Sequence, residues 1–95
     1  MKATWKGKTV AESDKVLEVH GYHYFPRDAV HMEFLSIAEK NESDLECPHG
    51  VQFYDLNHGK KHSERAAWSY EKPANKTMKT VDHWVAFWED VKVGT

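Results

Sequence analysis

Apolar and polar residues alternate with a period of two along most of this chain, in short runs that turn residues separate. Alternation of this kind places successive side chains on opposite faces of a β-strand and is typical of strands that are half buried. The run at residues 82–88 differs from the others, because its residues are apolar on both faces. We therefore expect a central strand there, with packed side chains covering both sides.

Turn residues divide the rest of the chain into further short strands. We expect these strands at residues 1–6, 9–12, 15–20, 22–25, 32–37, 51–56, 66–71 and 91–93. Helical turns are expected within 26–31 and 72–80, each with a proline near its start, a polar surface loop at 40–44 and a corner at 63–65. With about seven to nine short strands and no linker or repeat, residues 1–95 are expected to form a single mainly β domain, an antiparallel sandwich or partly open barrel.

Composition narrows the classes of function. Aromatic residues make up 13% of the chain and include four tryptophans, so they must fill much of a small core. A net charge of −2 gives no basic stripe of the kind that nucleic acids require. No apolar run approaches the roughly 20 residues that span a bilayer, and residues 1–6 lack the apolar centre of a signal peptide. We expect a cytoplasmic protein that binds neither nucleic acid nor membrane.

The stretch from Cys47 to Tyr70 contains the candidate site. The turn at 47–50 combines the single cysteine with proline and glycine, and the strand after it pairs with one that carries Trp68 and Tyr70 on the same face. These side chains could enclose a small-molecule pocket. The candidate ligand-binding residues are His49, Trp68, Tyr70, Tyr24, Tyr54 and Arg65. Core packing is the alternative for the aromatic residues, and we favour it for Trp84, Phe87 and Trp88; for Arg65 the alternative is contact with water alone.

Cys47 is the candidate catalytic residue. Side chains two positions apart in an extended chain share a face, so a Cys47 thiolate beside His49 could act as a nucleophile or redox centre. Free cysteine is also among the most buried residue types, and we favour packing over chemistry. A single cysteine excludes an intramolecular disulfide and any zinc site built from paired cysteines.

The seven histidines raise the possibility of a metal site. His20 and His23 have a spacing that shares a face on a helix but not on a strand, and His58 and His62 flank a turn. Neither pair matches an established ligand pattern. We favour exposed surface histidines, and we expect no metal and no cofactor.

Four motifs together resemble a known family. They are Tyr24-Phe25-Pro26, Cys47-Pro48-x-Gly50, Ala66-Ala67-Trp68-x-Tyr70 and Val85-Ala86-Phe87-Trp88. In order and spacing they resemble the domain-of-unknown-function family numbered 427, over nearly the whole chain. The resemblance implies a small β-tent fold, like that of methionine sulfoxide reductase B and formaldehyde-activating enzymes. It implies no established activity, although a "nucleotidyltransferase-like" label accompanies the family. The family usually reads Cys-Pro-x-Lys-Gly, and the turn at 47–50 lacks that lysine.

Three hypotheses of function remain open. The nucleotidyltransferase label finds little support, because the chain has neither a glycine-rich phosphate loop nor an Asp-x-Asp pair on a strand. We favour binding of an unidentified small molecule in an aromatic-lined pocket next to Cys47. One alternative is a structural or interaction module that pairs with a partner or with a second copy of itself. The other is a thiol-dependent enzyme that uses Cys47.

Overall fold

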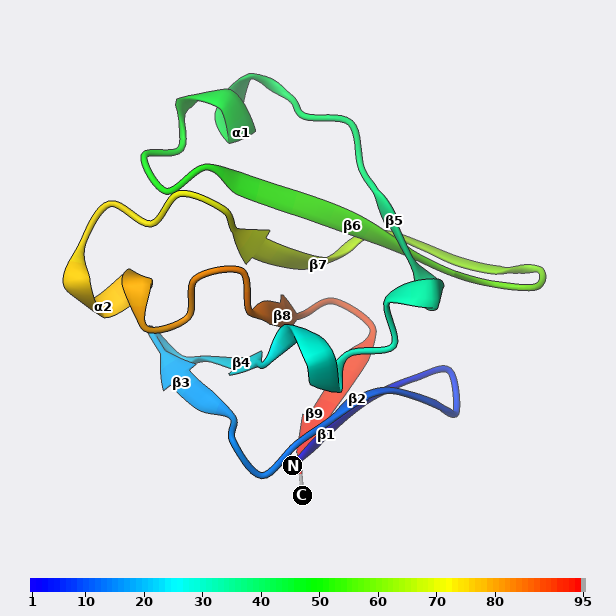
Figure 1. Cartoon of the computed structure of the whole chain (residues 1–95). Coiled ribbons are helices and arrows are strands. Elements are labelled where there is room, and N and C mark those ends of the chain that lie inside the picture. Colours follow the sequence, from blue (N-terminus) through cyan, green and yellow to red (C-terminus); the bar gives the residue numbers. More distant parts are fainter. Residues whose placement is uncertain (95) are drawn as a thin grey trace.

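Two antiparallel sheets that do not close on each other form the framework of the domain (Figure 1). The computed structural model describes residues 1–94, and within them nine strands are present. The small sheet has the order β2-β1-β9 and the large sheet the order β3-β4-β8-β7-β6-β5. The strands are β1 (Lys2–Trp5), β2 (Lys8–Glu12), β3 (Leu17–Val19), β4 (Tyr22–Phe25), β5 (Leu35–Ile37), β6 (Val51–His58), β7 (Lys61–Tyr70), β8 (Val85–Phe87) and β9 (Val91–Gly94). The expected mainly β fold is confirmed.

Residues 82–88 contain the central strand that their pattern predicts. β8 lies between β4 and β7 in the large sheet. Val85 and Phe87 belong to the core between the two sheets, whereas Ala86 belongs to a second core on the opposite side. The strand is shorter than the pattern, because His83 has a positive φ of 64° that interrupts an extended backbone.

The large sheet therefore has two packed faces, which we call the inner and the outer face. The inner face packs against the small sheet, and Trp5 and Val10 of that sheet meet Phe25 and Leu56 there. The outer face carries the second core, in which Trp68 packs with Met78 from the short helix α2 (Lys76–Lys79). Because side chains alternate along each strand, neighbouring residues of β7 serve different cores.

The short helices agree with part of the expectation. A 3₁₀ helix, η1 (Arg27–Ala29), lies within 26–31, and α2 lies within 72–80, so both expected helical turns are confirmed. Residues 32–37 divide into a 3₁₀ helix, η2 (Met32–Phe34), and β5, so the strand expected there exists only in its second half.

Residues 40–44 are not a loop throughout, and that expectation was wrong. Helix α1 (Glu42–Glu46) begins there because Asn41 and Asp44 form a capping box. The Asn41 side chain accepts the Asp44 N–H at 2.9 Å, and the Asp44 carboxylate accepts the Asn41 N–H at 3.2 Å.

The corner expected at 63–65 was also wrong, because β7 continues through it. The irregularity that the sequence signals is a bulge within the hairpin. The register of β6 and β7 shifts between Tyr54 and Leu56, and Arg65 has a positive φ of 53°. The Asp55 carboxylate stabilises this point by accepting the Arg65 N–H at 3.0 Å. Within residues 1–94, no helix is both long enough and apolar enough to cross a membrane.

Candidate functional site

Five aromatic side chains line an open space of about 240 Å³ on the outer face, which we call the aromatic hollow. Its lining consists of Tyr22, Phe53, Trp68, Tyr70 and Trp88. Strand pairing brings these residues together, because Phe53 of β6 lies opposite Trp68 of β7 in the register. Tyr22 comes from β4 and Trp88 directly follows β8. Four segments that are distant in sequence therefore meet at one place.

Trp68 occupies the base of the aromatic hollow, since only 5% of it is exposed. The Tyr22 ring lies 4.9 Å from the Trp68 ring, with an angle of 87° between their planes. The Trp88 ring lies 5.3 Å from the Trp68 ring at 72°. These are edge-to-face contacts, the arrangement that the quadrupole of an aromatic ring favours. Tyr22 and Trp88 therefore have planes steeply inclined to the base, whereas the Phe53 ring is inclined to it by 44°.

The two indole N–H groups of the hollow have acceptors within the protein. Trp88 Nε1 donates to the carbonyl oxygen of Arg65 at 2.5 Å, and Trp68 Nε1 donates to the hydroxyl of Tyr24 at 3.4 Å. These bonds fix the orientation of both rings. The tryptophans consequently offer the hollow their carbon and π surfaces.

The turn at Cys47 lies beside the aromatic hollow. Cys47, half buried, packs against the outer core, and the His49 ring lies 5.4 Å from the Tyr70 ring. The turn is hydrogen-bonded to the segment that follows β7, because Lys72 N donates to the His49 carbonyl at 2.9 Å. Gly50 has a φ of +63°, and a Cβ added to it would lie 3.2 Å from the Lys72 Cβ. Only glycine fits this backbone without strain.

Cys47 itself lines a different depression of about 280 Å³. The other residues around that depression are Lys40, Leu45, Pro48, Gly50, Glu71 and Lys72. His49 Nδ1 is occupied, since it accepts the Ala74 N–H at 2.9 Å. The thiol therefore contacts the outer core that also contains Trp68, but it does not line the aromatic hollow. Lys40 and Lys72 lie around this turn, which lacks the lysine that is usual in the resembled family.

Two of the nominated tyrosines lie behind the aromatic hollow or away from it. Tyr24 is buried beneath Trp68, with its ring 6.2 Å from both Trp68 and Tyr70, and burial raises the pKa of its hydroxyl. Burial also raises the pKa of Tyr70. Tyr54 is buried in the inner core, on the opposite face of the sheet.

Arg65 is held by an ion pair. Its Nη2 contacts both carboxylate oxygens of Asp44, at 2.7 and 2.9 Å. Its guanidinium carbon lies 4.1 Å from the centroid of the Phe53 ring. The hydrogen bond from Arg65 lowers the pKa of the Asp44 carboxyl. Arg65 thus packs against the ring of Phe53 and, through its carbonyl oxygen, accepts the hydrogen bond that orients the ring of Trp88.

Sequence reasoning missed three of the five residues of the hollow, namely Tyr22, Phe53 and Trp88. Core packing was expected for Trp88, because small β domains use aromatic residues to fill space. The signal for Tyr22 was present, since it shares a face with Tyr24 in a strand bounded by glycine and proline. Phe53 could not be predicted from the alternation of residues alone, because its place opposite Trp68 depends on the register between β6 and β7.

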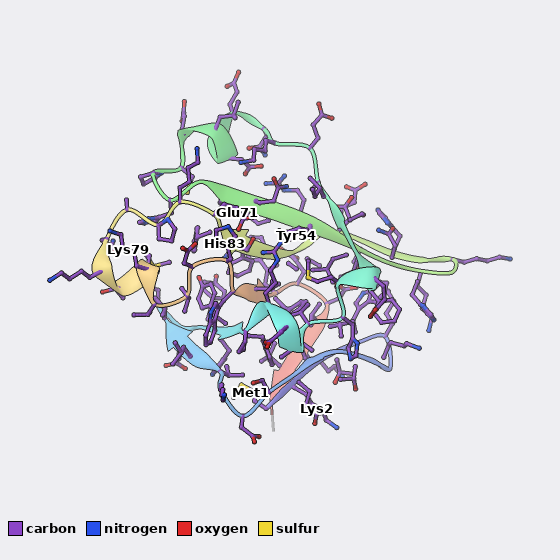
Figure 2. The ribbon with its side chains drawn as sticks, in the orientation of Figure 1. Met1, Lys2, Tyr54, Glu71, Lys79 and His83 are labelled. Atoms are coloured by element: carbon purple, nitrogen blue, oxygen red, sulfur yellow. The ribbon has the colours of Figure 1, made fainter. Side chains whose placement is uncertain are left out.

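A polar network on the inner face was also missed, apart from Tyr54 (Figure 2). Arg27 Nη2 donates to the Tyr54 hydroxyl at 2.8 Å, and that hydroxyl lies 3.1 Å from Oγ of the fully buried Ser69. Ser69 donates to the Glu71 carboxylate at 3.0 Å, so Tyr54 must donate to Ser69. Glu71 Oε2 also lies 3.7 Å from both Arg27 Nη1 and His83 Nε2. Ser69, within the otherwise apolar run at 66–70, is the signal that could have found it.

Comparison with known proteins identifies the family. A sequence model described as domain of unknown function (DUF427) matches residues 1–95. The chain belongs to this family. No curated protein matches the chain. The match confirms the resemblance carried by the four motifs, and in this DUF427 domain Trp68 and Tyr70 of the third motif and Trp88 of the fourth line the aromatic hollow. Among residues 1–94, no group of three or more His, Cys, Asp or Glu side chains is placed to hold a metal ion.

Proposed function

We propose that this domain binds a small molecule in the aromatic hollow beside the Cys47 turn. The observation that supports this most is the convergence of five aromatic side chains around an open space of about 240 Å³. Pockets for drug-sized ligands commonly measure about 300–1,000 Å³. The hollow therefore suits a small ligand, or one chemical group of a larger ligand.

Exposure of the lining distinguishes the hollow from a packed core. Tyr22 is 40% exposed, although its ring is in contact with the nearly buried Trp68. Phe53, Tyr70 and Trp88 are partly buried at the margin of the outer core. Large aromatic rings that are partly exposed to water have apolar surface that is not yet buried. A ligand that covers this surface removes it from water, which favours binding.

The hydrogen bonds and ion pair behind the hollow support a pre-formed site. Arg65 holds Trp88 by its carbonyl and packs on Phe53, and Asp44 holds the Arg65 guanidinium. Rings fixed before binding lose little conformational freedom when a ligand arrives. The site therefore needs no rearrangement of its backbone to accept a small molecule.

The tryptophans provide the test, because the chain contains an internal control. Trp68 and Trp88 line the hollow, whereas Trp5 is fully buried in the inner core. Titration of ¹⁵N-labelled protein with a panel of aromatic compounds, sugars, sulfoxides, nucleosides and alkylammonium ions should move the indole signals of Trp68 and Trp88 with at least one compound. The Trp5 signal should stay in place. A panel in which no compound moves the Trp68 or Trp88 signal would overturn the proposal.

A further inference from the structure

The geometry of the aromatic hollow points to a fully methylated ammonium group as its ligand. We infer that the hollow takes the quaternary ammonium end of a molecule such as choline, and this rests on the function proposed above. A quaternary ammonium is attracted to the negative faces of aromatic rings and needs no hydrogen-bond partner. The inference depends on what the lining offers, on the angles between its rings and on the charges around it.

The lining offers π surfaces and few polar groups. The indole N–H groups of Trp68 and Trp88 are bonded to Tyr24 and Arg65 within the protein. Phe53 has no polar atom, so the remaining polar groups are the hydroxyls of Tyr22 and Tyr70. A nucleobase or a sugar is recognised by several hydrogen bonds at fixed positions, and these two hydroxyls alone would leave most of its polar groups unpaired. A methylated ammonium has no such requirement.

The ring angles suit a rounded group better than a flat one. Tyr22 is inclined at 87° to Trp68, and Trp88 is inclined at 72° to Trp68. Phe53 is inclined at 44° to Trp68 and at 33° to Trp88, so none of these pairs of rings is parallel. A flat aromatic ligand gains most between two parallel rings, where both of its faces are covered. Rings inclined steeply to a common base form a corner, and a trimethylammonium group fills a corner with methyl groups directed at each face.

The charges near the hollow allow a cation. None of the five lining side chains is charged at neutral pH, and burial raises the pKa of Tyr70, which keeps that hydroxyl protonated. The cationic Arg65, which lies against Phe53, is paired with Asp44 through two contacts. Arg65 also shows that a ring of this lining accepts a cation, because its guanidinium lies 4.1 Å from the Phe53 centroid.

The experiment compares choline with its neutral isostere, in which carbon replaces the ammonium nitrogen. The two probes have nearly the same shape, so a difference in affinity reports the charge. We expect choline to bind about tenfold more tightly than the isostere, as a desolvated cation–π contact predicts. Binding is followed by the indole signals of Trp68 and Trp88 and by calorimetry. Tetramethylammonium should compete with choline.

Variants at Tyr22 separate the π surface from simple apolar contact. Tyr22 is 40% exposed, so its replacement should leave the fold intact, which thermal unfolding checks. Tyr22→Leu keeps an apolar side chain without a ring and should weaken choline binding at least about threefold. Tyr22→Phe keeps the ring and should retain most of the affinity. Ile37→Ala, at a residue that is 74% exposed and paired with Tyr54 rather than with the hollow, serves as the control.

The outcomes distinguish this inference from the function on which it rests. If the isostere or a flat aromatic compound moves the Trp68 and Trp88 signals as strongly as choline does, the ammonium inference is wrong and the binding function stands. If choline gives no saturable shift while another compound of the panel does, the conclusion is the same. If no compound moves these signals, both proposals are wrong.

Discussion

Trp68 and Trp88 lie with their ring centroids 5.3 Å apart on the outer face of the large sheet, and each donates its indole N–H to an acceptor away from the aromatic hollow. Trp68 belongs to β7, and Trp88 follows β8, the neighbouring strand in that sheet. The pair gives the hollow its base and one inclined side. A substitution of Trp68, which is nearly buried, is therefore expected to affect both the stability of the fold and ligand binding. A substitution of Tyr22, which is 40% exposed, is expected to affect mainly binding.

Truncation of Trp68 should destabilise the domain strongly. Trp68→Ala removes a side chain that is only 5% exposed and that contacts three other aromatic rings of the hollow, so we expect a loss of about 3–5 kcal/mol in the free energy of unfolding. Tyr22→Ala, at an exposed ring of the same cluster, should cost less than half as much. Urea unfolding followed by circular dichroism measures both. Equal losses for the two variants would contradict the assignment of Trp68 as the base.

The turn at Gly50 should tolerate alanine less well than the turn at Gly59. Both glycines have a positive φ, +63° and +61°, so alanine incurs the left-handed penalty of about 1–2 kcal/mol at each. Only at Gly50 would the new Cβ approach the Lys72 Cβ, at 3.2 Å. The change in unfolded-state entropy is the same in both variants and cancels in the comparison.

We therefore expect Gly50→Ala to be the less stable of the two variants in chemical unfolding. It should also disturb the contact of His49 with Tyr70, which the ring signals of Tyr70 report. A Gly59→Ala variant that is as destabilised as Gly50→Ala would show that the close approach of Lys72 has no energetic weight.

The Asp44–Arg65 ion pair should contribute stability that depends on pH. The hydrogen bond from Arg65 lowers the pKa of Asp44 in the folded state, below the value of about 3.9 in an unfolded chain. The contribution is therefore fully present above about pH 5 and is lost as the pH falls through the folded-state pKa. Asp44→Asn should cost about 1–3 kcal/mol at neutral pH, because Arg65 loses a charged partner that is 4% exposed.

Chemical unfolding of the wild type and of Asp44→Asn between pH 7 and about pH 3 tests whether this contribution is lost as the pH falls. The difference between wild type and Asp44→Asn should narrow as the pH falls below about 4. Asp14→Asn, at an exposed carboxylate, is the control and should show almost no difference at any pH. If the difference in the free energy of unfolding between wild type and Asp44→Asn stays constant across this pH range, the ion pair is not the source of that difference.

The inner-face network should make the Tyr54 hydroxyl important for stability. Tyr54→Phe leaves the buried Ser69 hydroxyl with one partner fewer and removes an acceptor from Arg27, so we expect a loss of about 1–2 kcal/mol. Tyr22→Phe removes an exposed hydroxyl and should change stability by less than about 0.5 kcal/mol. Guanidinium unfolding measures the free energy of unfolding of both variants. A Tyr54→Phe variant as stable as the wild type would contradict this account, because it would mean that water replaces the Tyr54 hydroxyl without loss of stability.

The sequence predicted the fold class and the faces of single strands, because both follow from local patterns. Alternation placed Trp68 with Tyr70 and left Ser69 and Glu71 on the opposite face, and the structure has both arrangements. The loop expected at 40–44 failed because the Asn41–Asp44 capping box was overlooked, although it can be read from the sequence.

The composition of the candidate site could be predicted only in part, since it depends on which strands become neighbours. Phe53 joins Trp68 through the register of β6 and β7, and a shift by one residue would have brought Tyr54 there instead. Trp88 reaches the hollow because β8 lies next to β7 in the large sheet. These relationships are tertiary, and no pattern within a single strand encodes them.

The titration of ¹⁵N-labelled protein, with the indole signals observed, tests the central claim most directly. A small-molecule site in the aromatic hollow predicts that at least one compound of the panel shifts the Trp68 and Trp88 signals in a saturable way, while Trp5, in the core between the two sheets, keeps its position. Signals that stay unmoved throughout the panel, or that shift together with Trp5, would contradict it.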